Sequence, residues 1–61
     1  MVSVLEQIKS MVFSQLQQGP KTSRVLASLI AHNEKGILTA IQEMVEDGLI
    51  ILNHRNQYDI R

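Results

Sequence analysis

Apolar residues recur at intervals of three and four positions through the first third of the chain, with polar residues between them. The stripe consists of Val2, Leu5, Ile8, Met11, Val12 and Leu16. This spacing places the apolar side chains on one face of a helix, so we predict an amphipathic helix over residues 2–18. Gly19 can adopt the left-handed conformation that closes a helix, and Pro20 cannot continue one. The chain therefore turns at this point.

A second helix is predicted over residues 22–31. Thr22 is a good capping residue, because its hydroxyl can accept a hydrogen bond from a backbone N–H of the first turn. Leu26, Leu29 and Ile30 supply the apolar stripe.

A third helix is predicted over residues 33–47, with Asn33 as its cap and Gly48 just beyond its end. Its apolar period consists of Ile37, Ile41, Met44 and Val45.

After Gly48 the helical period stops. Two short runs rich in apolar residues, 49–52 and 57–60, flank the polar loop 53–57. This pattern predicts a β-hairpin over residues 49–60, and Asn56, which tolerates positive φ, is the candidate turn residue.

Each predicted element has only one apolar face, so few arrangements bury them all. Packing the three helices together with the hairpin along one side does so. We therefore expect an α+β, mainly α fold: a single three-helix winged-helix domain over residues 1–61 with a C-terminal β-hairpin as its wing. At 61 residues the core is small. Because the apolar stripe of the first helix is wide, with Val4 and Phe13 at its margins, we expect that helix also to form a homodimer contact.

From Leu26 onward the residues resemble the winged helix-turn-helix family of transcription regulators. The matching residues are Leu26 and Ala27 on the second helix, Ala31 and Asn33 in the turn, Ile37, Ile41 and Met44 on the third helix, and Gly48, Leu49 and Ile50 before the wing. The resemblance covers essentially the whole chain. It implies DNA binding through the third helix, although the family also contains members that bind RNA or protein.

The chain departs from the family pattern at four positions. Ala31 replaces the usual turn glycine, and His32 stands where a buried apolar residue is common. Leu29 and Leu38 are apolar where the family is usually polar. Two interpretations of these leucines stay open: a surface for a protein partner, or additional cover for the core of a small domain.

Composition limits the chemistry. There is no cysteine and only two histidines, so no spacing typical of a zinc site occurs. No glycine-rich phosphate loop or nucleophile elbow is present. We expect no enzyme activity, cofactor or metal. The apolar runs are too short to span a membrane, which predicts a cytoplasmic protein without membrane association.

The placement of charge carries the functional argument, because the net charge is zero. Lys21, Arg24 and Lys35 lie at the starts of the second and third helices, where the helix dipole disfavours cations but where an anion would bind. In the expected fold these three residues and Arg55 of the wing converge on one side. Glu43, Glu46 and Asp47, at the end of the third helix, lie away from them. Such a polarised protein can present a local positive patch to phosphates.

The third helix supplies candidate base contacts. Its outward positions are Lys35, Gly36, Thr39 and Gln42. Lysine can donate to guanine, glutamine can pair with adenine, a threonine methyl can touch thymine, and glycine lets the helix approach closely. Ser23, Asn33, His54 and Arg55 are candidates for backbone or neighbouring-groove contacts.

The sequence thus predicts a sequence-specific regulator of transcription that binds double-stranded DNA with its third helix in the major groove. The alternative is a protein-binding winged-helix module, or an accessory factor of phage or plasmid type, that acts through an apolar surface including Leu29 and Leu38.

Overall fold

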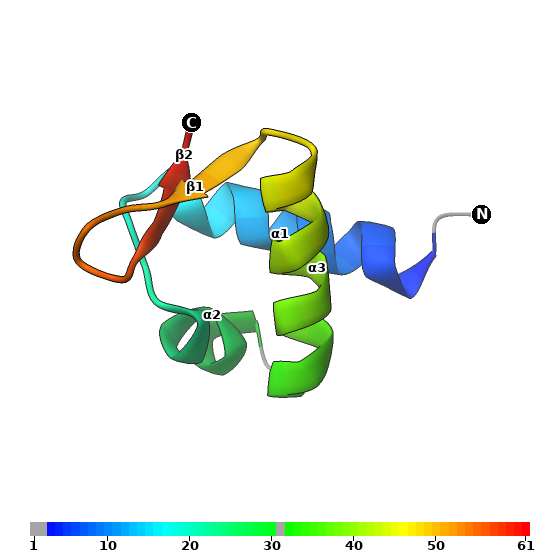
Figure 1. Ribbon diagram of the computed structural model, residues 1–61. Helices are drawn as coiled ribbons and strands as arrows, with labels where there is room; N and C mark the ends of the chain where they lie inside the picture. Colours follow the sequence, from blue (N-terminus) through cyan, green and yellow to red (C-terminus); the bar gives the residue numbers. More distant parts are fainter. Residues whose placement is uncertain (1–2, 31) are drawn as a thin grey trace.

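The computed structural model describes residues 3–30 and 32–61. Three helices, α1 (Val4–Leu16), α2 (Ser23–Ile30) and α3 (Glu34–Glu46), are followed by strands β1 (Ile50–Leu52) and β2 (Tyr58–Ile60) (Figure 1). The two strands form an antiparallel hairpin. The predicted α+β, mainly helical winged-helix fold is therefore confirmed. The expected start of the first helix at residue 2 and the family match at Ala31 lie outside the described residues.

Side-chain caps set the beginnings of the helices. The Thr22 hydroxyl accepts a hydrogen bond from the Val25 N–H at 3.2 Å, and the Asn33 carboxamide oxygen accepts one from the Gly36 N–H at 2.7 Å. Both predicted caps are confirmed. Ser3, which the sequence did not single out, caps α1 by accepting a bond from the Glu6 N–H at 3.1 Å. Each cap satisfies a backbone donor that the helix itself leaves unpaired.

Glycines end two of the helices in the described part of the chain. Gly48 has φ of +76° and Gly19 has φ of +136°. After α3, the Leu49 N–H donates to the Met44 carbonyl and the Gly48 N–H donates to the Val45 carbonyl, both at 3.0 Å. This pair of bonds is the Schellman arrangement, which needs a residue of positive φ. The chain can therefore reverse from α3 directly into β1.

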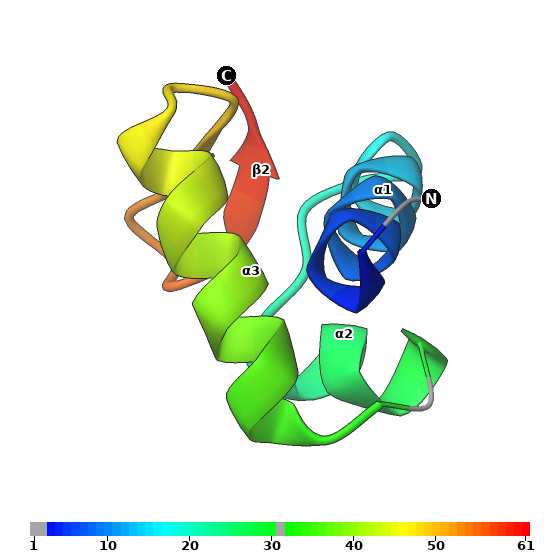
Figure 2. The same cartoon turned by 90° about the vertical axis from the view of Figure 1, so that its right-hand side faces the viewer.

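The core lies where α1 crosses behind α3 and α2 closes the lower end (Figures 1 and 2). Its buried side chains are Ile8, Val12 and Leu16 of α1, Leu26 of α2, Ile37, Ala40, Ile41 and Met44 of α3, and Ile50 of β1. Three members of the predicted apolar stripes, Met11, Leu29 and Val45, are instead exposed. The predicted stripes were wider than the area that the neighbouring helices cover.

The hairpin is tied to the helices through a backbone bridge. Ile50 pairs with Ile60 and Leu52 with Tyr58 across the two strands. On the other edge of β2, the Lys21 N–H donates to the Tyr58 carbonyl at 3.0 Å and the Tyr58 N–H donates to the Lys21 carbonyl at 2.7 Å. The segment that leads into α2 therefore makes a one-residue β-bridge to β2, which holds the hairpin against the helices.

Candidate nucleic-acid interface

The exposed face of α3 is the centre of the predicted interface. α3 lies in front of α1 in Figure 1 and beside it in Figure 2, so the face of α3 opposite α1 is turned away from the core. The side chains of Lys35, Thr39 and Gln42 are exposed on this helix, whereas Gly36 is half-buried. The Gln42 carboxamide makes no hydrogen bond to another described residue, so it is free to bind a ligand. Lys35, Thr39 and Gln42 are thus accessible on the helix that the sequence predicted to bind DNA.

Two candidate polar side chains, one in α3 and one at its N-cap, already have hydrogen-bond partners. The Thr39 hydroxyl donates to the Lys35 carbonyl at 3.0 Å, and the Asn33 side chain caps Gly36. Gly36 also has a steric role that the sequence did not indicate. A Cβ at this position would lie 2.7 Å from two ring atoms of His32. A side chain at position 36 would therefore displace the His32 ring, so the glycine has a role within the fold that does not depend on a ligand.

The loop of the hairpin holds two further candidate DNA-contact residues, His54 and Arg55. Asn53 organises this loop, because its carboxamide oxygen accepts bonds from the Arg55 N–H at 2.9 Å and the Gln57 N–H at 3.0 Å. Asn56 has φ of +61°, as predicted for the turn residue. The side chains of His54 and Arg55 are exposed at the tip of this ordered turn.

Arg24, Lys35 and Arg55 have no carboxylate partner among the described residues. Both ion pairs in the described part of the chain belong to Lys9, which lies 2.9 Å from Glu43 and 3.6 Å from Glu6. The Lys21 ammonium donates only to the Gly19 carbonyl, at 3.4 Å. Cations without acidic partners can bind phosphate without first breaking an ion pair.

An ion pair between Lys9 and Glu43 joins α1 to α3. The Lys9 side chain is only 17% exposed, and its hydrogen bond to Glu43 raises the pKa of Lys9 above the ordinary value of 10.5. The negative charges of Glu43, Glu6 and Asp47 act in the same direction. The Glu43 side chain is 42% exposed, so this ion pair lies at the surface between the two helices. No pattern in the sequence indicated that Glu43 has a partner on α1.

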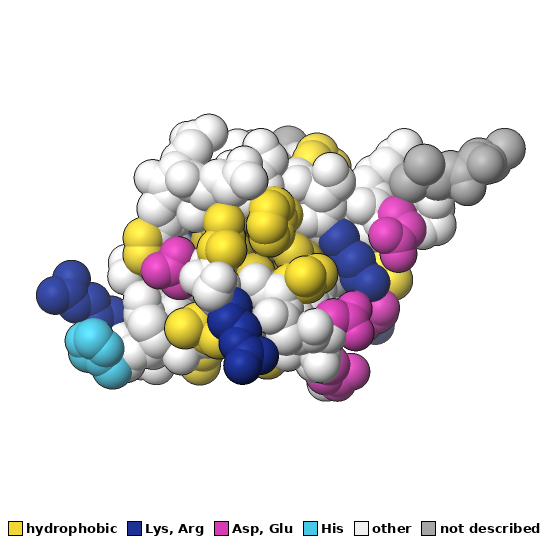
Figure 3. Space-filling model, turned by 90° about the horizontal axis from the view of Figure 1, so that it is seen from above, with side chains coloured by type: hydrophobic (Ala, Val, Ile, Leu, Met, Phe, Trp, Pro, Cys, Tyr) yellow, Lys and Arg dark blue, Asp and Glu magenta, His cyan; other side chains and the backbone are white. Residues whose placement is uncertain are grey.

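The structure ties Lys21 to the hairpin and presents Lys35, Thr39 and Gln42 on one helix, whereas Ser23 and Arg24 begin α2. Within residues 3–30 and 32–61, no hydrogen bond or ion pair connects candidate residues of different elements. On the face drawn in Figure 3, which looks down on the C-terminal end of α3, basic side chains occur singly and hydrophobic ones gather near the middle. Convergence of the four cations stays a prediction.

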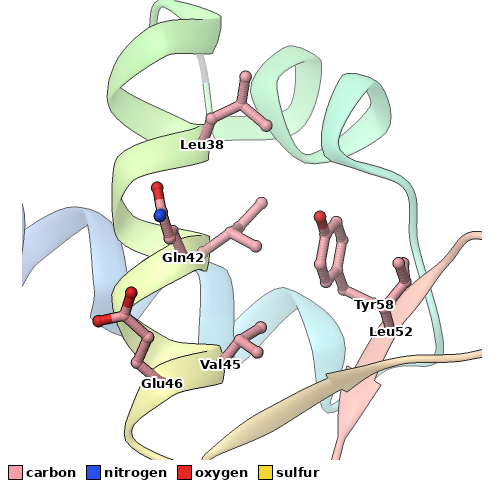
Figure 4. A pocket seen from close by; sticks show the side chains of 7 residues that line it. Leu38, Gln42, Val45, Glu46, Leu52 and Tyr58 are labelled. Carbon is pink, nitrogen blue, oxygen red and sulfur yellow. The ribbon is translucent and has the colours of Figure 1, made fainter.

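A groove between α3 and the hairpin is the feature that the sequence missed. It has a volume of about 480 Å³ and is lined by Leu38, Ile41, Gln42, Val45, Glu46, Leu52 and Tyr58. Leu38, Val45 and Leu52 are 43%, 40% and 53% exposed. Figure 4 shows Val45 pointing toward the hairpin, while the polar ends of Gln42 and Glu46 point outward. The continuous apolar run 49–52 has no alternation that could have identified Leu52 as a groove residue.

The groove also places an acidic side chain beside a predicted contact residue. The sequence predicted that the acids at the end of α3 lie away from the four cations, which stays a prediction, but Glu46 lies one turn after Gln42 and borders the same groove. One acidic side chain therefore adjoins the predicted contact residues.

Two further properties bear on function. Among the described residues, no helix is both long and apolar enough to cross a bilayer. In the same part of the chain, no three His, Asp or Glu side chains are grouped so that they could hold a metal ion. No protein-family model matches this chain, and no curated protein or solved structure matches it.

Proposed function

We propose that the protein binds double-stranded DNA in a sequence-specific manner and regulates transcription, with α3 in the major groove and the hairpin as its wing. The observation that carries this proposal is the exposed face of α3. Lys35 and Thr39 are accessible in the first half of the helix and Gln42 just beyond it, and Lys35 has no acidic partner among the described residues. In helix-turn-helix proteins the N-terminal part of the recognition helix contacts base edges.

Cations outside α3 support the same proposal. Arg24 lies in the first turn of α2, where the helix dipole also attracts a phosphate, and Arg55 lies at the tip of the hairpin. Both side chains are exposed and lack carboxylate partners in the described part of the chain. We expect Lys21, Arg24 and Arg55 to contact the DNA backbone, together with the polar groups of Ser23, Asn33 and His54.

The test is an anisotropy titration against a pool of labelled random duplexes at two salt concentrations. Arg24→Ala and Lys35→Ala should each weaken binding to all duplexes and lower the salt dependence, by about one unit of logarithmic slope per phosphate contact. Arg61→Ala is the matched control, because it removes one exposed cation that is not part of the proposed interface. If Arg24→Ala and Lys35→Ala leave an observed DNA interaction unchanged, the surface is assigned wrongly.

A second candidate function rests on the groove. Its exposed leucines and valine favour a protein-binding module, because contiguous apolar surface on a small domain is typical of interaction sites. Leu29 on α2 adds another exposed apolar side chain. Binding to duplexes that neither selects sequences nor responds to salt would favour this function over DNA recognition.

A further inference from the structure

Leu38 is an exposed leucine on the helix that we propose enters the major groove. The polar contacts proposed for that helix give no reason for an apolar side chain at this exposed position. Its side chain is 43% exposed and lies one turn before Gln42. Residues four apart on a helix lie on the same side and are separated by about 6 Å along its axis. A surface that accommodates Gln42 therefore also meets Leu38, and it must offer an apolar group there.

Thr39, the residue after Leu38, also presents an apolar group. Its hydroxyl donates its proton to the Lys35 carbonyl at 3.0 Å. This bond leaves no proton for donation to a base, so the γ-methyl is the group that Thr39 can offer to a ligand. Two neighbouring exposed positions of α3 thus present apolar groups, and Gln42 follows with a carboxamide that has no partner among the described residues.

In the major groove, only the A·T base pair displays both an apolar group and a pair of hydrogen-bonding groups that match a carboxamide. Thymine carries a C5-methyl group, and adenine offers a donor and an acceptor that a glutamine carboxamide matches bidentately. Guanine and cytosine edges are polar, so a leucine placed against them would remove water without replacing its hydrogen bonds.

We propose that α3 recognises neighbouring A·T base pairs, with Leu38 and the Thr39 methyl against thymine methyl groups and the Gln42 carboxamide on adenine. This inference rests on the proposed function, since it specifies what the DNA-binding helix reads. It also gives a role to Leu38, which departs from the family pattern.

The test compares three duplexes of equal length by anisotropy titration: one rich in A·T, the same one with every thymine replaced by deoxyuridine, and one rich in G·C. Deoxyuridine pairs with adenine but lacks the C5-methyl group. The protein should bind the thymine duplex most tightly, with a loss of about fourfold for each methyl contact that deoxyuridine removes. Gln42→Ala should reduce the preference for A·T over G·C while preserving the discrimination against deoxyuridine.

Two variants assign the methyl contacts. Thr39→Ser retains the hydroxyl that bonds to Lys35 and removes only the γ-methyl, so it should lower the ratio of affinities for thymine and deoxyuridine without unfolding α3. Leu38→Ala should lower this ratio further. Met11→Ala is the matched control, because Met11 is an exposed apolar residue of α1, outside the proposed interface, and its ratio should equal that of the wild type.

The outcomes separate the two proposals. Equal wild-type affinity for the thymine and deoxyuridine duplexes, with binding intact, overturns the methyl recognition and leaves the DNA-binding proposal standing. A preference for the G·C duplex does the same. Failure to bind any of the three duplexes or the random pool overturns both proposals.

Discussion

The imidazole ring of His32 lies against the backbone of Gly36, so that a Cβ at position 36 would come within 2.7 Å of two ring atoms. The turn between α2 and α3 therefore packs directly against the first turn of α3. His32 replaces the apolar residue that is common at this point in the family which the sequence resembles, and Gly36 makes room for it.

Replacing Gly36 tests this relationship. Alanine is more favourable than glycine in a helix, by up to about 1 kcal/mol in its interior. Here Gly36→Ala should gain less than this amount, or lose stability, because the His32 ring must move. In a His32→Ala background the same substitution should recover the full gain. Thermal unfolding of the four proteins in this double-mutant cycle measures the coupling, and identical effects of Gly36→Ala in both backgrounds would contradict it.

Asn33 should matter for stability as well as for binding. Asn33→Ala removes the acceptor for the Gly36 N–H and should destabilise the fold by about 1 kcal/mol. For a domain of this size, this corresponds to a fall in Tm of about 4–8 °C. Asn33→Asp keeps the acceptor and should retain most of the stability. A calorimetric scan that gives equal losses for both variants would show that the cap is not the cause.

Glu46 should weaken DNA binding, because its carboxylate lies one turn after Gln42 and points outward beside it. Glu46→Gln removes a negative charge near the phosphates and should raise duplex affinity by about two- to fivefold at low salt, with a smaller gain at high salt. Glu6→Gln on α1 is the control and should leave the affinity unchanged. Unchanged or weaker binding by Glu46→Gln would argue that DNA does not approach this end of α3.

The ion pair between Lys9 and Glu43 should make stability depend on alkaline pH. The pKa of Lys9 is raised in the folded protein, chiefly by its hydrogen bond to Glu43. Its stabilising contribution is therefore complete below the ordinary value of 10.5 and is lost as the pH rises through the higher folded pKa. Lys9→Gln should be less stable than the wild type at pH 8, and the difference should shrink above pH 10.5. Lys35→Gln is the control, because it removes a lysine without an ion pair among the described residues. Its difference in stability from the wild type should not shrink in this way as the pH rises.

We expect dimerisation to involve α1. Val4 and Met11 are seven positions apart, which places them on the same side of the helix, and both are exposed. Sedimentation equilibrium should show association that depends on concentration, and Val4→Lys combined with Met11→Lys should abolish it. Leu52→Lys, in the groove of the hairpin, should leave association intact. A monomer mass at every concentration would remove this expectation.

The helices and their ends followed from local sequence. Thr22 and Asn33 cap the helices as predicted, and Gly19, Gly48 and Asn56 adopt the positive φ that their positions required. These features depend on residues within about four positions, so periodicity and capping chemistry are sufficient to identify them. The order of elements then left few ways to bury their apolar faces, which is why the fold was also predictable.

Tertiary packing alone decided which apolar residues became surface. Leu29, Val45 and Met11 follow the same helical spacing as the core residues, yet no other element in the described part of the chain covers them. The ion pair of Lys9 with Glu43 joins residues from different helices, and the groove depends on how far the hairpin stands from α3. Periodicity reports the direction of a side chain on its own helix, whereas burial depends on the distance to another element. For this reason the sequence determined the elements, and only the tertiary structure determined the surface available for binding.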